Sequence, residues 1–289
     1  MLGLDPDPGR LWPRALEIAE REPKGGDHRS PSERAARAVA AHCRLVLEAV
    51  SECCVAVKPQ LACFERLGAA GWGALAEVVA DARDRGLVVI ADGKRGDIDI
   101  SARAYAQAFF GATESPFGRR QSLGVDALTV NPLLGRDSLT PLVDAARADG
   151  GGLFVLTRTS NPGAADVQDQ LLEGGGTVSA LLARIVDEIG RDGIGATGLA
   201  DVGAVTGATA PDRLEALRTA MPHAILLLPG IGPQGATGEE LAPAYTPGRA
   251  GGLVSASRAI VYAGTGSACA GAAAQAANTL RELVWGLYS

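Results

Sequence analysis

The sequence is poor in cysteine, histidine and aromatic residues, and it has no excess of positive charge. Five cysteines in 289 residues form no C-x-x-C motif, so their spacing indicates neither a disulfide framework nor a thiolate metal site, and we expect reduced thiols. The net charge is −6 and aromatic residues make up only 4%, with no basic stripe, so nucleic acid is not an expected partner. An anionic ligand would have to be held by local cations.

The chain also lacks segments that would direct it to a membrane. No run of about 18 apolar residues is present, as a membrane-spanning helix requires. The first residues, Met1–Asp5, have neither a cationic start nor an apolar stretch of the kind found in signal peptides. We therefore expect a cytoplasmic protein without a membrane partner.

Short apolar runs recur along the chain, and each ends in a polar residue or a turn signal. They are Leu2–Leu4, Cys54–Val57, Val88–Ala91, Ala127–Val130, Leu153–Leu156, Gly203–Val205, Ala224–Leu228 and Gly252–Val254. Segments with helical spacing lie between or after them: Ser32–Ala49, Trp72–Asp84, Thr140–Ala148, Val178–Ile189, Pro211–Ala220 and Ala268–Ala277. Eight alternating units predict an α/β protein, a single (β/α)8 TIM barrel over residues 1–289. A doubly wound sheet is the alternative, but it gives no reason for eight units without a domain break.

Three Gly- and Pro-rich stretches are expected to be long loops: Glu22–Pro31, Asn161–Gly176 and Ile231–Gly251. The third follows the seventh expected strand, on the face where barrels bind phosphate, so it is a candidate for a mobile lid. The first is interpreted as a tolerated insertion.

Charged residues collect where the first three strands end. Asp92-x-Lys94-x-x-Asp97 follows Val88–Ala91, and two carboxylates beside an ammonium favour its charged form. Asp5 and Lys58 end the two preceding strands. A single D-x-K motif would be interpreted as a salt bridge. Five charged side chains at the carboxyl ends of neighbouring strands instead indicate the active site of a barrel.

The last two strands are followed by groups suited to an anion. Gly230, Gly232 and Gln234 in the segment Pro229–Gly235 offer main-chain and amide N–H groups. Ser255–Arg258 opens a helix, and both the helix N-terminus and the guanidinium of Arg258 attract phosphate. We predict a phosphate site here.

Hydroxyl and amide groups follow the fifth expected strand in the segment Thr157–Asn161, where Ser160 could read the polar edge of a base. Alternatively, Ser160 and Asn161 only cap the next segment. None of the three histidines stands at a strand end, so neither a histidine metal site nor histidine acid–base catalysis is expected. No Walker phosphate loop is present either.

With these residues in place, the chain resembles the orotidine 5′-phosphate decarboxylases, in particular their longer bacterial (type 2) subfamily. The segments that carry the resemblance are Gly3–Pro6, Val57–Gln60, Asp92–Ile98, Arg158–Pro162, Pro229–Gly232 with Gln234-Gly235, and Ser257-Arg258. The resemblance implies a carboxy-lyase that converts orotidine 5′-phosphate to UMP and CO2 in de novo pyrimidine biosynthesis. It implies no cofactor and no metal, and a homodimer with shared active sites.

The resemblance also implies catalytic roles at the strand ends. Lys94 would donate the proton to C6 of the pyrimidine, and Lys58 would hold Asp92 in position. Asp97 would reach across the interface into the partner subunit's site. Preorganised charge would then supply most of the barrier reduction, with repulsion of the substrate carboxylate by Asp92 as a further contribution.

Substrate-binding roles follow from the same resemblance. Asp5 and Lys58 would bind the ribose hydroxyls, and Ser101 would contact the ribose from the side of Asp97. Ser160 would read the pyrimidine. The phosphate would be bound by Gln234 and Arg258.

The chain departs from the family pattern in three places. Gly93 replaces a more usual alanine, Asp99-Ile100 stands where Gly-Ser is common, and the chain starts directly on its first strand without a short helical lead-in.

Two other functions are alternatives to decarboxylation. A related sugar-phosphate enzyme with the same D-x-K-x-x-D motif would need Mg²⁺, which the ammonium of Lys58 disfavours. A catalytically inactive phosphate-ligand binder is disfavoured by the intact Lys94, Asp92 and Asp97.

Overall fold

The structure is a computed structural model that describes residues 1–21, 29–207, 211–229 and 238–286. One sheet contains eight strands in the order β1 (Leu2–Leu4), β2 (Ala56–Pro59), β3 (Val88–Arg95), β6 (Ala127–Val130), β7 (Gly152–Arg158), β8 (Val202–Thr206), β9 (Leu226–Pro229) and β10 (Gly252–Ser255). The pairs β1–β2, β2–β3, β6–β7, β7–β8, β8–β9 and β9–β10 are parallel. Ala256, directly after β10, forms a parallel bridge with Leu2 of β1.

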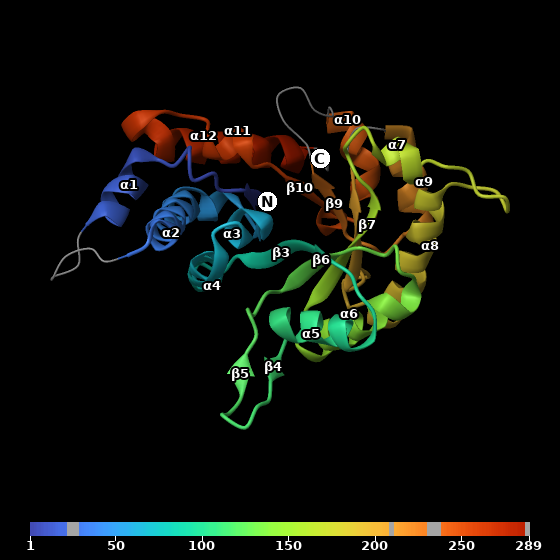
Figure 1. Ribbon diagram of the computed structural model, residues 1–289. Helices are drawn as coiled ribbons and strands as arrows, with labels where there is room; N and C mark the ends of the chain where they lie inside the picture. The colour runs from blue at the N-terminus through green and yellow to red at the C-terminus, as the bar shows by residue number, and fades with distance from the viewer. Residues whose placement is uncertain (22–28, 208–210, 230–237, 287–289) are drawn as a thin grey trace. The chain divides into compact units, whose positions relative to one another are not determined.

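Helices follow every strand of this sheet (Figure 1). They are α1 (Pro13–Glu20), α2 (Pro31–Val50), α3 (Ala62–Glu65), α4 (Gly68–Asp84), α5 (Asp99–Phe109), α6 (Arg136–Ala148), α7 (Ala164–Val167), α8 (Val178–Gly190), α9 (Pro211–Ala220), α10 (Gly238–Leu241), α11 (Arg258–Val261) and α12 (Cys269–Gly286). This strand order, with helices in each connection, is that of a (β/α)8 barrel and confirms the expected fold class.

The contacts divide the chain into two compact units. Unit 1 comprises Met1–Gly93 and Ala256–Glu282, and unit 2 comprises Lys94–Ser255 and Leu283–Ser289, so the boundary passes through β3. In unit 1, α2 packs against α1 and α4. The start of α2 is defined by a capping box between Ser30 and Glu33, with a proline in the first turn.

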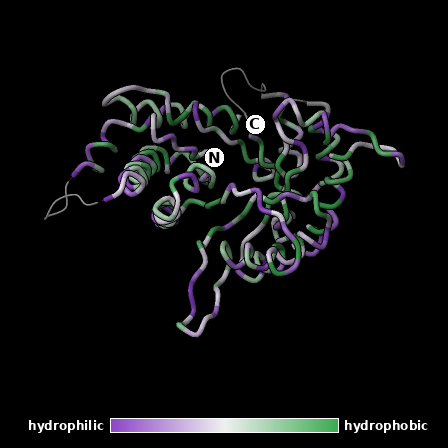
Figure 2. The backbone as a smooth tube through the Cα atoms, viewed as in Figure 1, coloured by the Kyte–Doolittle hydropathy of each residue, from purple (hydrophilic) through white to green (hydrophobic). Residues whose placement is uncertain are grey.

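In unit 2, α5 packs against α6 and α8 packs against α9. Figure 2 shows largely hydrophobic strands in this unit, and every residue of β6 and β8 is buried. Strands that are covered on both faces read as continuous apolar runs, which is why the sequence identified them. A short hairpin, β4 (Ala112–Thr113) with β5 (Arg120–Gln121), projects from this unit beyond α5 (Figure 1).

Several expected bounds are corrected by the structure. β2 begins at Ala56 and not at Cys54, because Ser51–Cys53 form a 3₁₀ turn and Cys54 and Val55 connect this turn to the strand. β3 continues through Arg95 and β7 through Arg158, so Asp92 and Lys94 lie within β3, and Thr157 and Arg158 lie within β7. Helix α9 has the expected bounds, α2 is longer than expected by one residue at each end, and α8 is longer by one residue at its C-terminal end.

Two of the expected long loops contain helical turns. Asn161–Gly176 includes α7, and the described part of Ile231–Gly251 includes α10 and 3₁₀ turns at Ala242–Tyr245 and Arg249–Gly251. The lid stays a prediction, since residues 230–237 lie outside the described residues. Most of Glu22–Pro31 also lies outside them, and its last residue, Pro31, begins α2.

All five cysteines are free thiols. Among the helices that the structure describes, none is long and apolar enough to cross a membrane.

Candidate active site

A buried ion pair joins β2 and β3 in unit 1. Lys58 Nζ donates to Asp92 Oδ2, and the two side chains are 9% and 7% exposed. The same carboxylate oxygen accepts a hydrogen bond of 3.1 Å from Gln60 Nε2, and the main-chain N–H of Leu61 donates to the Asp92 carbonyl at 3.2 Å. Charges are expensive to bury unless they are paired and hydrogen-bonded. The arrangement therefore holds the Asp92 carboxylate ionised and fixed in direction.

Asp5 stands directly after β1 and is exposed. Among the described residues, no hydrogen bond or ion pair of its carboxylate is present. The loop that follows Asp5 is held by Arg66, whose guanidinium donates to the Pro6 carbonyl at 2.5 Å. Asp5 is thus an acceptor available to a ligand at the end of β1.

Arg258 is the first residue of α11, as expected, and its side chain is exposed. Within the described part of the chain, its guanidinium has no ion pair. The helix has only four residues, so it contributes less dipole than a longer helix would. The guanidinium is the main positive charge at this position.

Lys94 has a strained main chain at the end of β3. Its φ is +46°, in the left-handed region that non-glycine residues rarely adopt. The conformation is held by Thr129 of β6, a fully buried residue whose Oγ1 accepts the Lys94 main-chain N–H at 2.9 Å. The side chain of Lys94 itself is exposed.

The chain after Lys94 passes very close to the end of β6. The Asn131 main-chain N–H donates to the Arg95 carbonyl at 2.8 Å. A Cβ on Gly96 would lie 2.8 Å from the Asn131 carbonyl oxygen, so only glycine fits without a shift of the main chain. This close approach sets the direction in which the chain leaves β3.

Asp97 and Ser101 lie on this exit segment. Asp97 Oδ1 accepts a hydrogen bond of 2.8 Å from the main-chain N–H of Ile98, just before α5 begins. Ser101 is in the first turn of α5 and is exposed. The neighbouring apolar residues Ile98 and Ile100 are exposed as well, the latter by 76%.

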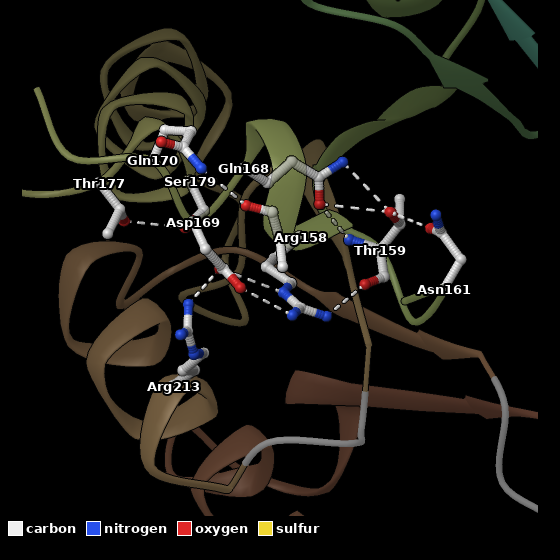
Figure 3. A network of polar contacts seen from close by, with 10 residues as sticks. Arg158, Thr159, Asn161, Gln168, Asp169, Gln170, Thr177, Ser179 and Arg213 are labelled. Atoms are coloured by element: carbon white, nitrogen blue, oxygen red, sulfur yellow. Dashed lines mark hydrogen bonds and ion pairs between the residues drawn. The ribbon is translucent and has the colours of Figure 1, made fainter. Parts of the chain in front are cut away.

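The segment after β7 is tied down by an ionic network (Figure 3). Arg158 Nη2 pairs with Asp169 Oδ2 at 2.9 Å, and Arg213 from α9 pairs with the other oxygen of the same carboxylate. The hydrogen bonds from Arg158 hold the pKa of Asp169 below its usual value. Arg158 Nη1 also donates to the Thr159 carbonyl at 2.6 Å. Arg158 therefore anchors the segment and is not directed to a ligand.

Ser160 is positioned by the main chain around it. Gln168 Oε1 accepts the Thr159 main-chain N–H at 2.7 Å, and Thr159 Oγ1 donates to Asn161 Oδ1 at 2.6 Å, so the Asn161 side chain is engaged locally (Figure 3). Gly207 packs against Ser160, since a Cβ on Gly207 would lie 2.8 Å from Ser160 Cα. In the residues that the structure describes, the Ser160 hydroxyl has no hydrogen-bond partner, which leaves it available to a ligand.

The predicted site residues are thus found in both units. Asp5, Lys58, Asp92 and Arg258 belong to unit 1, whereas Lys94, Asp97, Ser101 and Ser160 belong to unit 2. The predicted phosphate contacts Gly230, Gly232 and Gln234 lie outside the described residues.

Sequence reasoning assigned no role to three residues that support the site: Gln60, Thr129 and Gly207. A threonine inside the otherwise apolar strand Ala127–Val130 was the available signal for Thr129. The close approach of Gly207 to Ser160 left no signal in the sequence.

Comparison with known proteins identifies the family of the chain. The model of the "Orotidine 5'-phosphate decarboxylase / HUMPS family" matches residues 34–273. Orotidine 5′-phosphate decarboxylase of Deinococcus radiodurans is 48% identical over 237 residues, which cover 82% of this chain and 81% of the relative. That of Rhodopirellula baltica is 42% identical over 262 residues, covering 91% and 83%.

The fold is shared with solved structures of the same name. The OMP decarboxylase of Leishmania donovani superposes with a TM-score of 0.71 at 28% identity, over 99% of this chain and 92% of that one. Since the family model matches most of the chain and the relatives exceed 40% identity over most of their own length, the chain belongs to the orotidine 5′-phosphate decarboxylase / HUMPS family.

Proposed function

We propose that this protein decarboxylates orotidine 5′-phosphate to UMP and CO2 in pyrimidine biosynthesis, with Lys94 as the proton donor. The observation that carries the proposal is the placement of Lys94 two residues after Asp92, whose carboxylate is fixed by Lys58 and Gln60. The relatives that share this chain's length and sequence are orotidine 5′-phosphate decarboxylases.

The use of lysine supports the assignment. The chain has only three lysines, Lys24, Lys58 and Lys94, and arginine supplies the other cations of the 27 basic residues. Arginine does not give up its proton at neutral pH, whereas an ammonium can. Lysine at two neighbouring strand ends therefore fits a site where a proton moves.

The proposed step balances with these groups alone. The bond between C6 and the carboxylate carbon breaks, the electron pair stays on C6, and CO2 leaves. C6 then takes a proton from Lys94 Nζ, and solvent returns a proton to the amine. An ammonium placed where negative charge develops lowers the barrier, because it costs no reorganisation during the reaction. Asp92 beside the substrate carboxylate adds repulsion that is relieved as CO2 departs.

The remaining groups bind the parts of the nucleotide that do not react. Asp5, Lys58 and Ser101 would bind the ribose hydroxyls. Ser160 would form a hydrogen bond, as donor or acceptor, with the polar edge of the pyrimidine. Arg258 would bind the phosphate together with Gly230, Gly232 and Gln234. Binding energy from the phosphate can then be used to hold the base against Lys94.

No cofactor or metal is part of the proposal. Asp92 already has Lys58 as its counter-ion, and a second cation at the same carboxylate would be repelled by that ammonium. The Mg²⁺-dependent sugar-phosphate alternative would need this carboxylate as a ligand.

The decisive experiment follows the ultraviolet absorbance of orotidine 5′-phosphate after the purified protein is added, with and without a chelator. We expect the substrate signal to be lost at the same rate in both samples. Absence of turnover would refute the proposed function, and turnover restored only by Mg²⁺ would favour the metal-dependent alternative.

The active unit is proposed to be a homodimer in which Asp97 serves the partner subunit's site. Exposed apolar side chains surround the exit from β3 and the end of β6, namely Ile98, Ile100, Leu133 and Leu134. An isologous contact would cover these residues and bring two copies of Asp97 across the interface. The single domain over residues 1–289, the type 2 subfamily and the cytoplasmic location stay predictions.

A further inference from the structure

The loop that follows β1 contacts α11 within unit 1. Trp12 Nε1 donates a hydrogen bond of 2.9 Å to the Val261 carbonyl, and the guanidinium of Arg10 lies 4.1 Å from the ring centroid of Tyr262. Val261 is the last residue of α11 and Tyr262 is the next. Two contacts therefore join the loop after Asp5 to the short helix that begins at Arg258.

A helix of four residues needs such support. One turn of helix does not form in water by itself, and the last carbonyls of a helix lack partners inside it. In α11 the Val261 carbonyl obtains its partner from the Trp12 indole. Since Val261 lies one turn from Arg258, a displacement of this carbonyl is transmitted to the main chain of Arg258.

Trp12 is itself held rigidly. Its side chain is 5% exposed, and its main-chain N–H donates to His42 Nδ1 at 3.1 Å. The two rings meet edge to face with centroids 5.5 Å apart, and His42 is fully buried in α2. The indole N–H thus has a fixed direction, as expected for a group that positions another.

We propose that Trp12 is a positioning residue that aligns Arg258 with the phosphate of the nucleotide. This inference rests on the proposed function, in which Arg258 binds that phosphate. Trp12 acts through α11 and does not touch the ligand. Its loss is therefore expected to weaken binding of the phosphate and to leave contacts to the base and ribose unchanged.

The test compares UMP with uridine, which lacks the phosphate, in Trp12→Phe and wild-type protein by titration calorimetry. The variant keeps an aromatic ring and removes the indole N–H. We expect the Kd for UMP and the KM for orotidine 5′-phosphate to rise about 5- to 10-fold, as for one lost hydrogen bond. The Kd for uridine and kcat should change by less than about twofold. Trp72→Phe, at an exposed position of α4 in the same unit, is the matched control and should change neither.

A double-mutant cycle separates positioning from general damage. In an Arg258→Ala background, Trp12→Phe should have little further effect on UMP binding, because the group that it aligns is gone. Additive losses, or equal losses for UMP and uridine, would overturn the inference. Circular dichroism monitors folding, and if Trp12→Phe does not fold, Arg10→Gln at an exposed position removes the Tyr262 contact and should give a smaller effect in the same direction.

These measurements distinguish failure of the positioning role of Trp12 from failure of the proposed function. Wild-type protein that binds UMP but does not turn over orotidine 5′-phosphate would refute the function and leave the positioning measurable. Wild-type protein that binds UMP no better than uridine would refute the role of Arg258 and, with it, that of Trp12.

Discussion

The main-chain N–H of Lys94 donates to the hydroxyl of Thr129 at 2.9 Å, and this contact accompanies a left-handed main chain at Lys94. Left-handed conformations cost about 1–2 kcal/mol for residues other than glycine. Glycine would adopt this conformation at lower cost, and the proposed role of Lys94 as proton donor gives a reason for lysine at this position.

We predict that replacing Lys94 separates stability from activity. The free energy of unfolding of Lys94→Gly, measured by urea denaturation, should exceed that of Lys94→Ala by about 1 kcal/mol, because glycine relieves the strain. Both variants should lose nearly all turnover, since neither can donate a proton. Retention of a tenth of wild-type kcat by either variant would contradict the role of Lys94.

The buried pair of Lys58 and Asp92 should respond differently to single and double substitution. Lys58→Met removes the counter-ion of a buried carboxylate, so the free energy of unfolding should fall by about 3 kcal/mol. Lys58→Met with Asp92→Asn removes both charges and should recover most of that loss while remaining inactive. Urea denaturation measures both, and a double variant as unstable as the single one would count against the pair.

The contact between Gly207 and Ser160 should matter for the substrate. In Gly207→Ala, the new Cβ would lie 2.8 Å from Ser160 Cα, so the main chain that carries Ser160 has to move. We expect kcat/KM to fall at least about tenfold, since small displacements of positioning groups are costly. Gly174→Ala, with nothing within 4 Å of its Cβ, is the control and should behave as wild type. Equal activity of the two variants would show that Ser160 does not need this position.

His42 should make the protein sensitive to acid. Burial lowers its pKa from 6.5 to about 4, so the unfolded chain binds a proton in a pH range where the folded protein does not. Stability is therefore at its full value above about pH 6.5 and falls as the pH drops toward 4, by up to about 3 kcal/mol from this residue. Urea denaturation at pH 7.5, 6.5 and 5.5 should show a steeper loss for wild type than for His42→Gln. Identical pH slopes would exclude His42 as the cause.

The shared site can be tested by complementation. Lys94→Ala and Asp97→Ala chains should each be inactive, and mixing them under conditions of subunit exchange should restore about a quarter of wild-type activity. About half of the dimers are then mixed, and in each of these both lesions fall in one site, so the other site is intact. If exchange is confirmed and the mixture stays inactive, Asp97 serves its own barrel.

The sequence alone determined the strand-by-strand plan of this protein and the identity of its charged residues. Strands buried on both faces must be continuously apolar, so the eight runs could be read directly, as could the carboxylates and lysines at their ends. Their chemical type is a local property of the chain. For this reason Asp92, Lys94 and Arg258 could be proposed before any geometry was available.

Only the tertiary structure decided how these residues are held. The hydrogen bonds that hold the site join residues far apart in the sequence. The separation is 32 residues for Gln60–Asp92, 35 for Lys94–Thr129 and 249 for Trp12–Val261. A hydrogen bond between distant residues depends on where the fold places both groups, and neither residue type alone reveals its partner. Neither α5 nor the β4–β5 hairpin was predicted. The buried face of α5 consists of Ala102, Ala106 and Phe109, two of them small residues, and no residue of β4 or β5 is buried, so the local hydrophobic pattern is weak in both.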